Sequence, residues 1–207
     1  MLKIIRVSAR GFGANTFILT QDDKNAVVID PAQPRIQAEL IKLNLTARFV
    51  LLTHCHFDHV GGVSSLQQAG AKVLCLDKEK PLIGTDADLF SRFQAPREWY
   101  TVDKTLTDGE EIELCSVAIT VIETAGHTAG SACYLVKDTE GNKHLFTGDT
   151  LFQGSIGRTD FPTGDLSALR QSLKRLSNLE DMPIYTGHGD ESTIAFERKN
   201  NPFLADV

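Results

Sequence analysis

The chain has 207 residues, of which 42% are hydrophobic and 23% are charged. This length and composition are typical of one compact globular domain, and they exclude a disordered or fibrous protein. The formal net charge of -6 argues against a broad phosphate-binding surface, so we expect no nucleic-acid partner.

The N-terminus and the cysteines indicate a cellular compartment. The first ten residues, MLKIIRVSAR, mix charges with apolar positions, so they match neither a secretion signal nor a membrane span. Cysteines stand at positions 55, 75, 115 and 133 without a CxxC pair, which favours reduced thiols over a disulfide framework or a zinc finger. We therefore expect a cytoplasmic protein without a membrane partner.

The predicted elements mix strands with helices along the chain. Short apolar runs bounded by turn residues predict strands at 2–8, 15–20, 25–30, 48–53, 71–76, 111–114, 117–124, 131–136, 143–148 and 183–186. Helical spacing of apolar residues predicts helices at 35–43, 60–69, 166–176 and 192–199. The segment 80–102 has no clear pattern and is expected to be irregular. This order predicts sheets in the interior and helices outside.

Three of the six histidines fall in one block, His54-Cys55-His56-Phe57-Asp58-His59. The block follows the predicted strand 48–53, so we expect it on a loop at a sheet edge. In extended backbone, side chains two residues apart point the same way. His54 and His56 should therefore face one point, with Asp58 and His59 facing a neighbouring one. Cys55 should point away and pack in the core.

Further candidate ligands follow other predicted strands. His127, Asp149 and His188 each stand after a strand and beside glycines, which allow close backbone approach. One metal needs three or four ligands, so this set predicts a metal centre at one edge of a sheet. A purely structural metal is a weaker alternative, because structural zinc favours closed sites rich in cysteine. The sixth histidine, His144, is expected to be an ordinary strand residue.

The pattern HxHxDH followed by distant His, Asp and His resembles the metallo-β-lactamase fold superfamily, and the resemblance spans nearly the whole chain. It implies an α/β fold, an αββα sandwich of two mixed β-sheets with helices on both outer faces. It also implies a first metal held by His54, His56 and His127, a second held by Asp58, His59 and His188, and Asp149 bridging both.

Such a centre has a definite chemistry. A metal lowers the pKa of a bound water from about 15.7 to about 7, and two ions can also polarise a carbonyl. Asp149 would be catalytic through its bridging position, and Asp58 is a candidate for orienting groups and handling protons. We expect two divalent ions, with zinc first and iron or manganese as alternatives, because His/Asp sites accept all three.

Within the superfamily, two stretches resemble the small bacterial glyoxalase II type, a hydroxyacylglutathione hydrolase. They are TGDTLFQGSIGRTDFPTGD and GHGDESTIAFERKNNPFL. Arg158 matches a basic residue that grips a glutathione carboxylate in that family. Pairing of Arg158 with Asp160 or Asp165 on the surface is the alternative. Only 19 residues follow His188, so we expect a single domain over 1–207 without a C-terminal helical glutathione-binding domain.

The expected function is a dinuclear hydrolase of thioesters such as S-lactoylglutathione, with a small molecule as the partner. One alternative is a mononuclear iron persulfide dioxygenase of the same fold, whose family shares the GRTDF stretch. A less specific metallo-hydrolase and a non-catalytic metal-binding module are further alternatives. A β-lactamase is favoured less, because no export signal is present. The sequence does not decide the oligomeric state.

Overall fold

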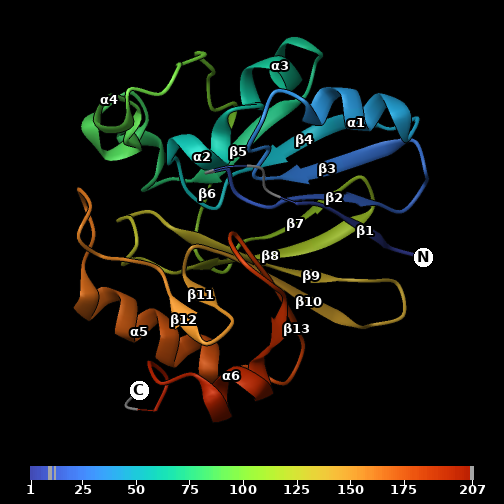
Figure 1. The fold of residues 1–207 in the computed structure, drawn as a ribbon. Helices are drawn as coiled ribbons and strands as arrows, with labels where there is room; N and C mark the ends of the chain where they lie inside the picture. The colour runs from blue at the N-terminus through green and yellow to red at the C-terminus, as the bar shows by residue number, and fades with distance from the viewer. Residues whose placement is uncertain (9–10, 12, 206–207) are drawn as a thin grey trace.

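Two six-stranded sheets stack face to face in this computed structural model, which describes residues 1–8, 11 and 13–205 (Figure 1). The first sheet has the order β1 (Lys3–Val7), β2 (Thr16–Thr20), β3 (Asn25–Ile29), β4 (Thr46–Leu51), β5 (Lys72–Leu76) and β6 (Lys104–Leu106). The second has the order β14 (Ser192–Thr193), β13 (Pro183–Thr186), β10 (Lys143–Gly148), β9 (Ala132–Lys137), β8 (Val117–Glu123) and β7 (Glu111–Leu114). A small hairpin joins β11 (Leu151–Phe152) to β12 (Ser155–Ile156).

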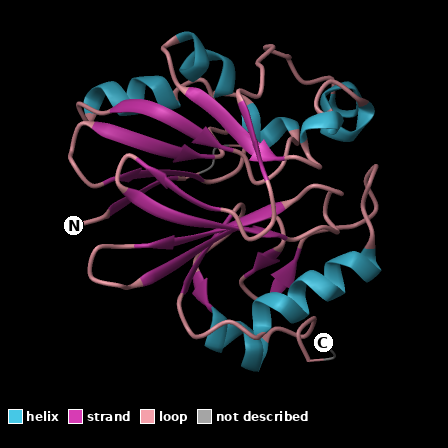
Figure 2. Cartoon of the chain, turned by 180° about the vertical axis from the view of Figure 1, so that it is seen from behind, coloured by secondary structure: helices cyan, strands magenta, loops and turns pink. Residues whose placement is uncertain are grey.

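Helices cover both outer faces of this pair of sheets (Figure 2). The first sheet is covered by helices that include α1 (Ile36–Lys42) and α3 (Val63–Gln68), and the second by α5 (Leu166–Ser177) and α6 (Ile194–Asn200). Shorter helical turns are α2 (Phe57–Val60), η1 (Lys80–Leu82), η2 (Asp86–Asp88) and α4 (Phe90–Phe93). Both sheets contain parallel and antiparallel pairs. The predicted αββα sandwich of two mixed sheets is therefore confirmed.

The buried apolar side chains form three hydrophobic layers. In β3, Val27 and Ile29 face the layer between the sheets, whereas Val28 faces the layer beneath α1 and α3. Successive side chains of a strand point to opposite faces, so one apolar strand serves both layers. The third layer lies between the second sheet and α5, which contributes Leu169 and Leu173. Their spacing of four residues places both on one face of the helix.

Several predicted boundaries differ from the structure. The helix expected at 60–69 begins only at Val63, because Val60 ends α2 and the chain turns at Gly61-Gly62 against the loop after β3. A Cβ on Gly62 would meet the carbonyl oxygens of Pro31 and Gln33, so only glycine fits there. The segment 80–102 contains three short helical turns, and the residues 192–193 pair as β14 before α6 begins. The three-residue β6 and the β11–β12 hairpin were not predicted, because such short strands depend on their partners.

The direction of the strands decides where the site lies. β3, β4 and β5 run parallel, so their carboxyl ends meet at one edge of the first sheet. In the second sheet, β10 is parallel to β13 and antiparallel to β9, which is antiparallel to β8, so the carboxyl ends of β8, β10 and β13 also coincide. Ligands bind outside such strand ends in open sheets. Among the described residues, no helix has the length and apolar character needed to cross a membrane.

Candidate metal centre

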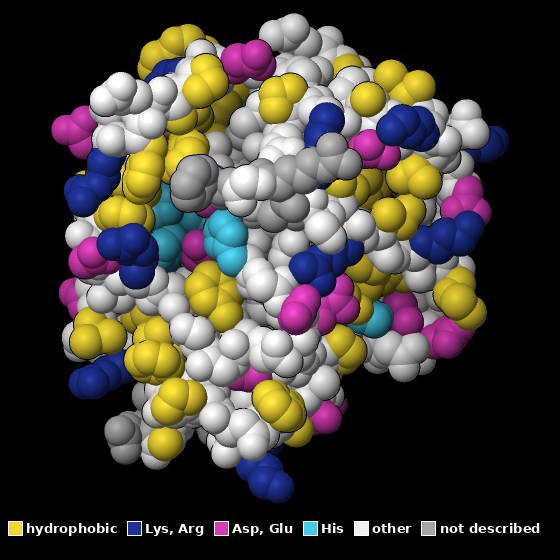
Figure 3. All heavy atoms as spheres, in the orientation of Figure 1, with side chains coloured by type: hydrophobic (Ala, Val, Ile, Leu, Met, Phe, Trp, Pro, Cys, Tyr) yellow, Lys and Arg dark blue, Asp and Glu magenta, His cyan; other side chains and the backbone are white. Residues whose placement is uncertain are grey.

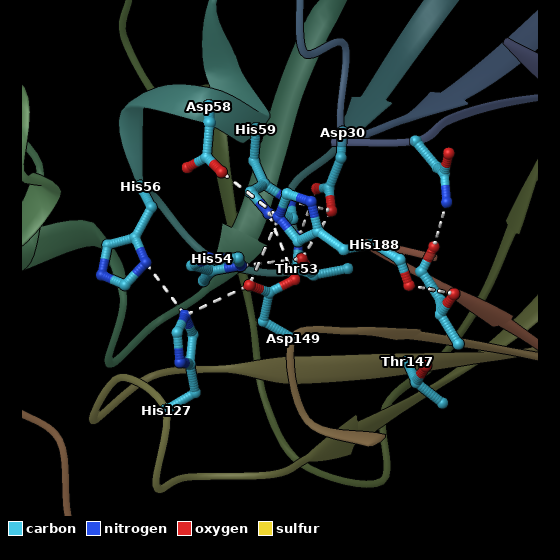
Figure 4. A network of polar contacts seen from close by, with 12 residues as sticks. Asp30, Thr53, His54, His56, Asp58, His59, His127, Thr147, Asp149 and His188 are labelled. Carbon is cyan, nitrogen blue, oxygen red and sulfur yellow. Dashed lines mark hydrogen bonds and ion pairs between the residues drawn. The ribbon is translucent and has the colours of Figure 1, made fainter. Parts of the chain in front are cut away.

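The structure brings all seven predicted metal-site residues together between the two sheets (Figure 4). Each residue comes from a segment that follows a strand. His54 and His56 lie on the loop after β4, Asp58 and His59 in α2, His127 after β8, Asp149 after β10 and His188 after β13. Residues separated by more than 130 positions thus meet because parallel strands end at the same edge.

The first group consists of His54, His56 and His127, all buried. The Nδ1 atom of His56 lies 2.9 Å from Nε2 of His127. The ring of His54 lies 4.6 Å from the ring of His56 and 4.8 Å from that of His127, measured between centroids. Three imidazoles therefore converge on one small volume from two different sheets.

The second group consists of Asp58, His59 and His188. Nε2 of His188 lies 3.2 Å from Oδ2 of Asp58 and 3.3 Å from Nε2 of His59. Asp149 stands between the two groups. Its Oδ1 lies 3.3 Å from Nε2 of His59, and its Oδ2 lies 3.6 Å from Nε2 of both His127 and His188. One carboxylate thus contacts both groups.

Two of the imidazoles are oriented by hydrogen bonds at Nδ1, the ring nitrogen that faces away from the site. Nδ1 of His127 lies 2.7 Å from the carbonyl oxygen of Arg158, which can only accept. Nδ1 of His59 lies 2.9 Å from Oδ2 of Asp30. These partners assign the proton of each neutral ring to Nδ1 and leave the lone pair of Nε2 facing the site. Both rings are therefore held in the tautomer that a metal ligand requires.

Asp30 is a site residue that the sequence reasoning missed. Its Oδ1 accepts from the backbone N–H of Thr53 at 2.8 Å, and its Oδ2 accepts from the Thr53 hydroxyl at 2.6 Å. The same hydroxyl oxygen lies 3.0 Å from Nδ1 of His54. Although Asp30 lies close to His54 and His59, its oxygens are occupied by these donors, so it supports the imidazoles. Asp30 ends the predicted strand 25–30, and this position at a strand end is the sequence feature that could have identified it.

The electrostatics favour neutral imidazoles in the first group and an ionised Asp149. Burial and the neighbouring His127 lower the pKa of His56 to about 3, and burial with nearby histidines holds the pKa of His54 well below its usual value. Burial opposes ionisation of Asp149, but the surrounding histidines, His59 foremost, outweigh it and lower its pKa. The Asp149 and Asp30 carboxylates raise the pKa of His59, despite its burial. Metal binding needs deprotonated ligands, and a cation at Nε2 of His59 would replace a proton there.

Two observations indicate that this space fits cations. His54 Nε2, His56 Nε2 and Asp149 Oδ1 are buried without any hydrogen-bond partner among the described residues. Such atoms are costly to bury unless something pairs with them, and a cation would pair with lone pairs at His54 and Asp149. The backbone also makes room, since a Cβ at Gly187 would meet Asp149 Oδ1 and His59. The donor set of imidazole and carboxylate suits zinc, iron and manganese alike.

A cleft of about 570 Å³ opens above the two groups. His56, His127 and His188 lie at its floor, and its walls include Phe93 and Phe161. Histidine side chains are visible in a hollow bordered by hydrophobic side chains (Figure 3). A small molecule with an apolar portion fits this mixture of lining groups.

Arg158 lies at the same cleft, and it forms the surface ion pair with Asp160 that the sequence offers as its alternative role. Its Nε and Nη2 donate to the Asp160 carboxylate, both at 2.6 Å, and its guanidinium lies 3.9 Å from the centre of the Phe161 ring. The side chain is 55% exposed, so it remains accessible to a ligand. Asp165 instead caps α5 by accepting from Ala168 N.

The other two residues singled out by sequence also have clear places. Cys55 is fully buried and belongs to none of the candidate metal-binding groups of the described residues, in agreement with its predicted packing role. His144 lies in β10 near the Tyr185 hydroxyl and Asp138, away from the seven site residues, as predicted.

The fold and the site define a class of αββα proteins whose sheet edge is able to bind metal ions. The model of the metallo-beta-lactamase superfamily matches residues 9–188, and the chain belongs to this family. It is 36% identical to hydroxyacylglutathione hydrolase GloC of Haemophilus influenzae, over 98% of this chain and 97% of that protein.

Three solved structures share the fold over most of the chain. BLEG-1 B3 metallo-beta-lactamase is 33% identical with a TM-score of 0.86, covering 99% of this chain and all of that one. TTHA1623 in a di-iron-bound form is 34% identical with a TM-score of 0.82, covering 97% and 100%. ETHE1 from Myxococcus xanthus is 26% identical with a TM-score of 0.79, covering 99% and 85%. The family and the similarity to GloC support a metal-dependent hydrolase.

Proposed function

We propose that this protein is a dinuclear metal-dependent hydrolase of thioesters, with S-lactoylglutathione or a similar hydroxyacyl thioester as substrate. The observation that carries the proposal is the position of Asp149, whose two oxygens contact both His/Asp groups at the floor of an accessible cleft. The similarity to hydroxyacylglutathione hydrolase GloC supports the choice of a thioester.

In this proposal, His54, His56 and His127 hold one ion, Asp58, His59 and His188 hold the second, and Asp149 contacts both. When bound, the ions supply an activated water at neutral pH and polarise a carbonyl oxygen. Two ions are favoured over one because the second group is as complete as the first. The relative in a di-iron-bound form agrees with two positions, while zinc stays our first expectation.

The chain itself binds and orients the substrate. Aromatic walls such as Phe93 and Phe161 exclude water from the reacting carbonyl, and Arg158 offers a cation for a carboxylate elsewhere on the substrate. Asp58 lines the cleft, and although burial opposes its ionisation, the hydrogen bond from His188 lowers its pKa, so it stays ionised and can orient a water by accepting a hydrogen bond. A thiolate leaves readily, so the reaction needs no strong general acid.

Both sheets contribute ligands to one site, so we further propose that residues 1–207 act as a single domain. A cytoplasmic location is part of the same proposal. It is supported by the four unpaired cysteines, which suit a reducing compartment.

A metal analysis followed by a substrate panel tests the function. We expect two metal equivalents per chain, turnover of S-lactoylglutathione, and loss of that turnover after chelation with restoration by added zinc. The panel also contains glutathione persulfide and a β-lactam. One iron per chain with oxygen consumption on the persulfide would instead establish the dioxygenase alternative. Tightly bound metal without turnover of any compound would establish a non-catalytic module.

The role of Arg158 is tested separately. Arg158→Ala should raise KM for S-lactoylglutathione by roughly two- to fivefold, the range expected for an exposed charge contact, with little change in kcat. A lactoyl thioester of a neutral thiol such as N-acetylcysteamine should show no change in KM. Asp160→Asn is the matched control, since it frees Arg158 and should not raise KM. An equal effect of Arg158→Ala on both thioesters would contradict carboxylate binding.

A further inference from the structure

Glu79 is a buried carboxylate that none of the proposed chemistry uses. It lies in the turn between β5 and η1 and has no exposed surface. Its Oε1 accepts from the backbone N–H of Cys55 at 2.7 Å, and its Oε2 accepts from the Thr128 hydroxyl at 2.8 Å. The backbone N–H of Gly130 also donates to it. Burying an ion is costly, so these donors are what make the carboxylate acceptable here.

The two loops that Glu79 joins carry the first group of metal-site residues. Cys55 stands between His54 and His56, and Thr128 directly follows His127. The first loop belongs to one sheet and the second to the other, so a single side chain ties the two sheets together behind the site. Nδ1 of His56 and Nε2 of His127, 2.9 Å apart, belong to these two loops.

The packing around Glu79 shows that the loops are in direct contact. A Cβ on Gly130 would meet the backbone of Lys78 and Glu79, so the loop after β8 lies against the turn after β5. Thr128 is itself held by Ser131, whose Oγ lies 2.7 Å from the Thr128 hydroxyl. A hydrophobic residue at position 79 would fill the space but could not accept from Cys55 N–H.

We propose that Glu79 is a positioning residue that sets the separation of His56 and His127 and thereby the affinity of the first group for its metal ion. The inference rests on the proposed function only in requiring that this group binds metal. It does not depend on the identity of the substrate. Groups that orient metal ligands in this way change metal affinity by about 10- to 100-fold when they are replaced.

The test is metal affinity in Glu79→Gln, which keeps the size of the side chain but turns one acceptor into a donor facing Thr128. Affinity for Co²⁺ and Zn²⁺ is measured by chelator competition, both with Glu79→Gln as the only substitution and in a His188→Ala background that retains the first group. We expect affinity at the first group to fall about 10- to 100-fold and the visible absorption spectrum of bound Co²⁺ to shift. In turnover, kcat should fall more than KM rises.

Glu197→Gln is the matched control. Glu197 is equally buried and accepts from Gly154 N, Ser192 Oγ and Asn201 Nδ2, but it contacts neither ligand loop. It should lose thermal stability while keeping metal affinity and the Co²⁺ spectrum.

Thr128→Ala and Thr128→Ser keep the test decisive even where Glu79→Gln fails to fold. Alanine removes one donor to Glu79 and should weaken metal binding, and serine should restore it. Unchanged affinity and an unchanged spectrum in Glu79→Gln, or in Thr128→Ala where the former does not fold, would overturn the inference. If the protein binds metal but turns over no thioester, the proposed function is contradicted. The effect of Glu79 on metal affinity can still be measured in that case.

Discussion

Replacing His188 with alanine is expected to reduce the bound metal from two ions per chain to one and to slow thioester hydrolysis by about 10²-fold or more. His188 contacts Asp58 and His59 but lies outside the first group. A metal ion contributes several kcal/mol to stabilisation of transition-state charge, and each 1.36 kcal/mol is about tenfold in rate. Its side chain is 36% exposed, so the change should leave no buried cavity.

Metal content and steady-state kinetics measure this effect, with His144→Ala as the control histidine substitution. The control should keep two ions and full hydrolysis, because His144 lies away from the site. Near-full thioester hydrolysis in His188→Ala would contradict the dinuclear proposal. A dioxygenase with one iron at the first group should retain its activity in the same variant, so the two functions separate clearly.

The structure makes His188 a better choice than His59 for this substitution. His59 donates to Asp30, and Asp30 also holds Thr53, whose hydroxyl lies beside His54. His59→Ala would therefore disturb both groups at once, and loss of activity would not tell one metal from two.

Gly187→Ala is expected to weaken metal binding about 10²-fold or more and to bring hydrolysis close to background. The added Cβ would meet Asp149 Oδ1 and stand 2.8 Å from Cε1 of His59 and 3.0 Å from the carbonyl carbon of Gly148. Asp149 would have to move away from one of the two groups. A misplacement of about 1 Å in a catalytic constellation costs about 10²-fold in rate.

Gly189→Ala separates this steric effect from backbone strain. Gly189 has φ +75° with open space around the position of a Cβ. Alanine there should cost about 1 kcal/mol of stability from the left-handed backbone, but it adds no atom to the site. Thermal unfolding and metal content are measured for both variants. Two retained metal equivalents in Gly187→Ala would show that the site is wider than the structure indicates.

Local sequence patterns predicted much of the fold because a run of apolar residues identifies a buried strand without knowledge of its partners. The strands over 25–30 and 117–124 are found nearly as expected, since both are rich in β-branched residues. The first is buried on both faces, and the second is buried mainly on the face toward the other sheet. The segment 80–102 could not be predicted in this way. Its helical turns last three or four residues, and such turns depend on surrounding contacts such as the Asp88–Arg97 ion pair.

The sequence by itself determined which residues are the candidates for a metal centre, because histidine and aspartate after predicted strands form a pattern that chance rarely produces. Only the tertiary structure decided that Asp30 supports the imidazoles and that Glu79 joins the two ligand loops. These roles depend on contacts between segments far apart in the chain. Local patterns cannot encode such contacts, because they arise only when parallel strands from two sheets end at one edge.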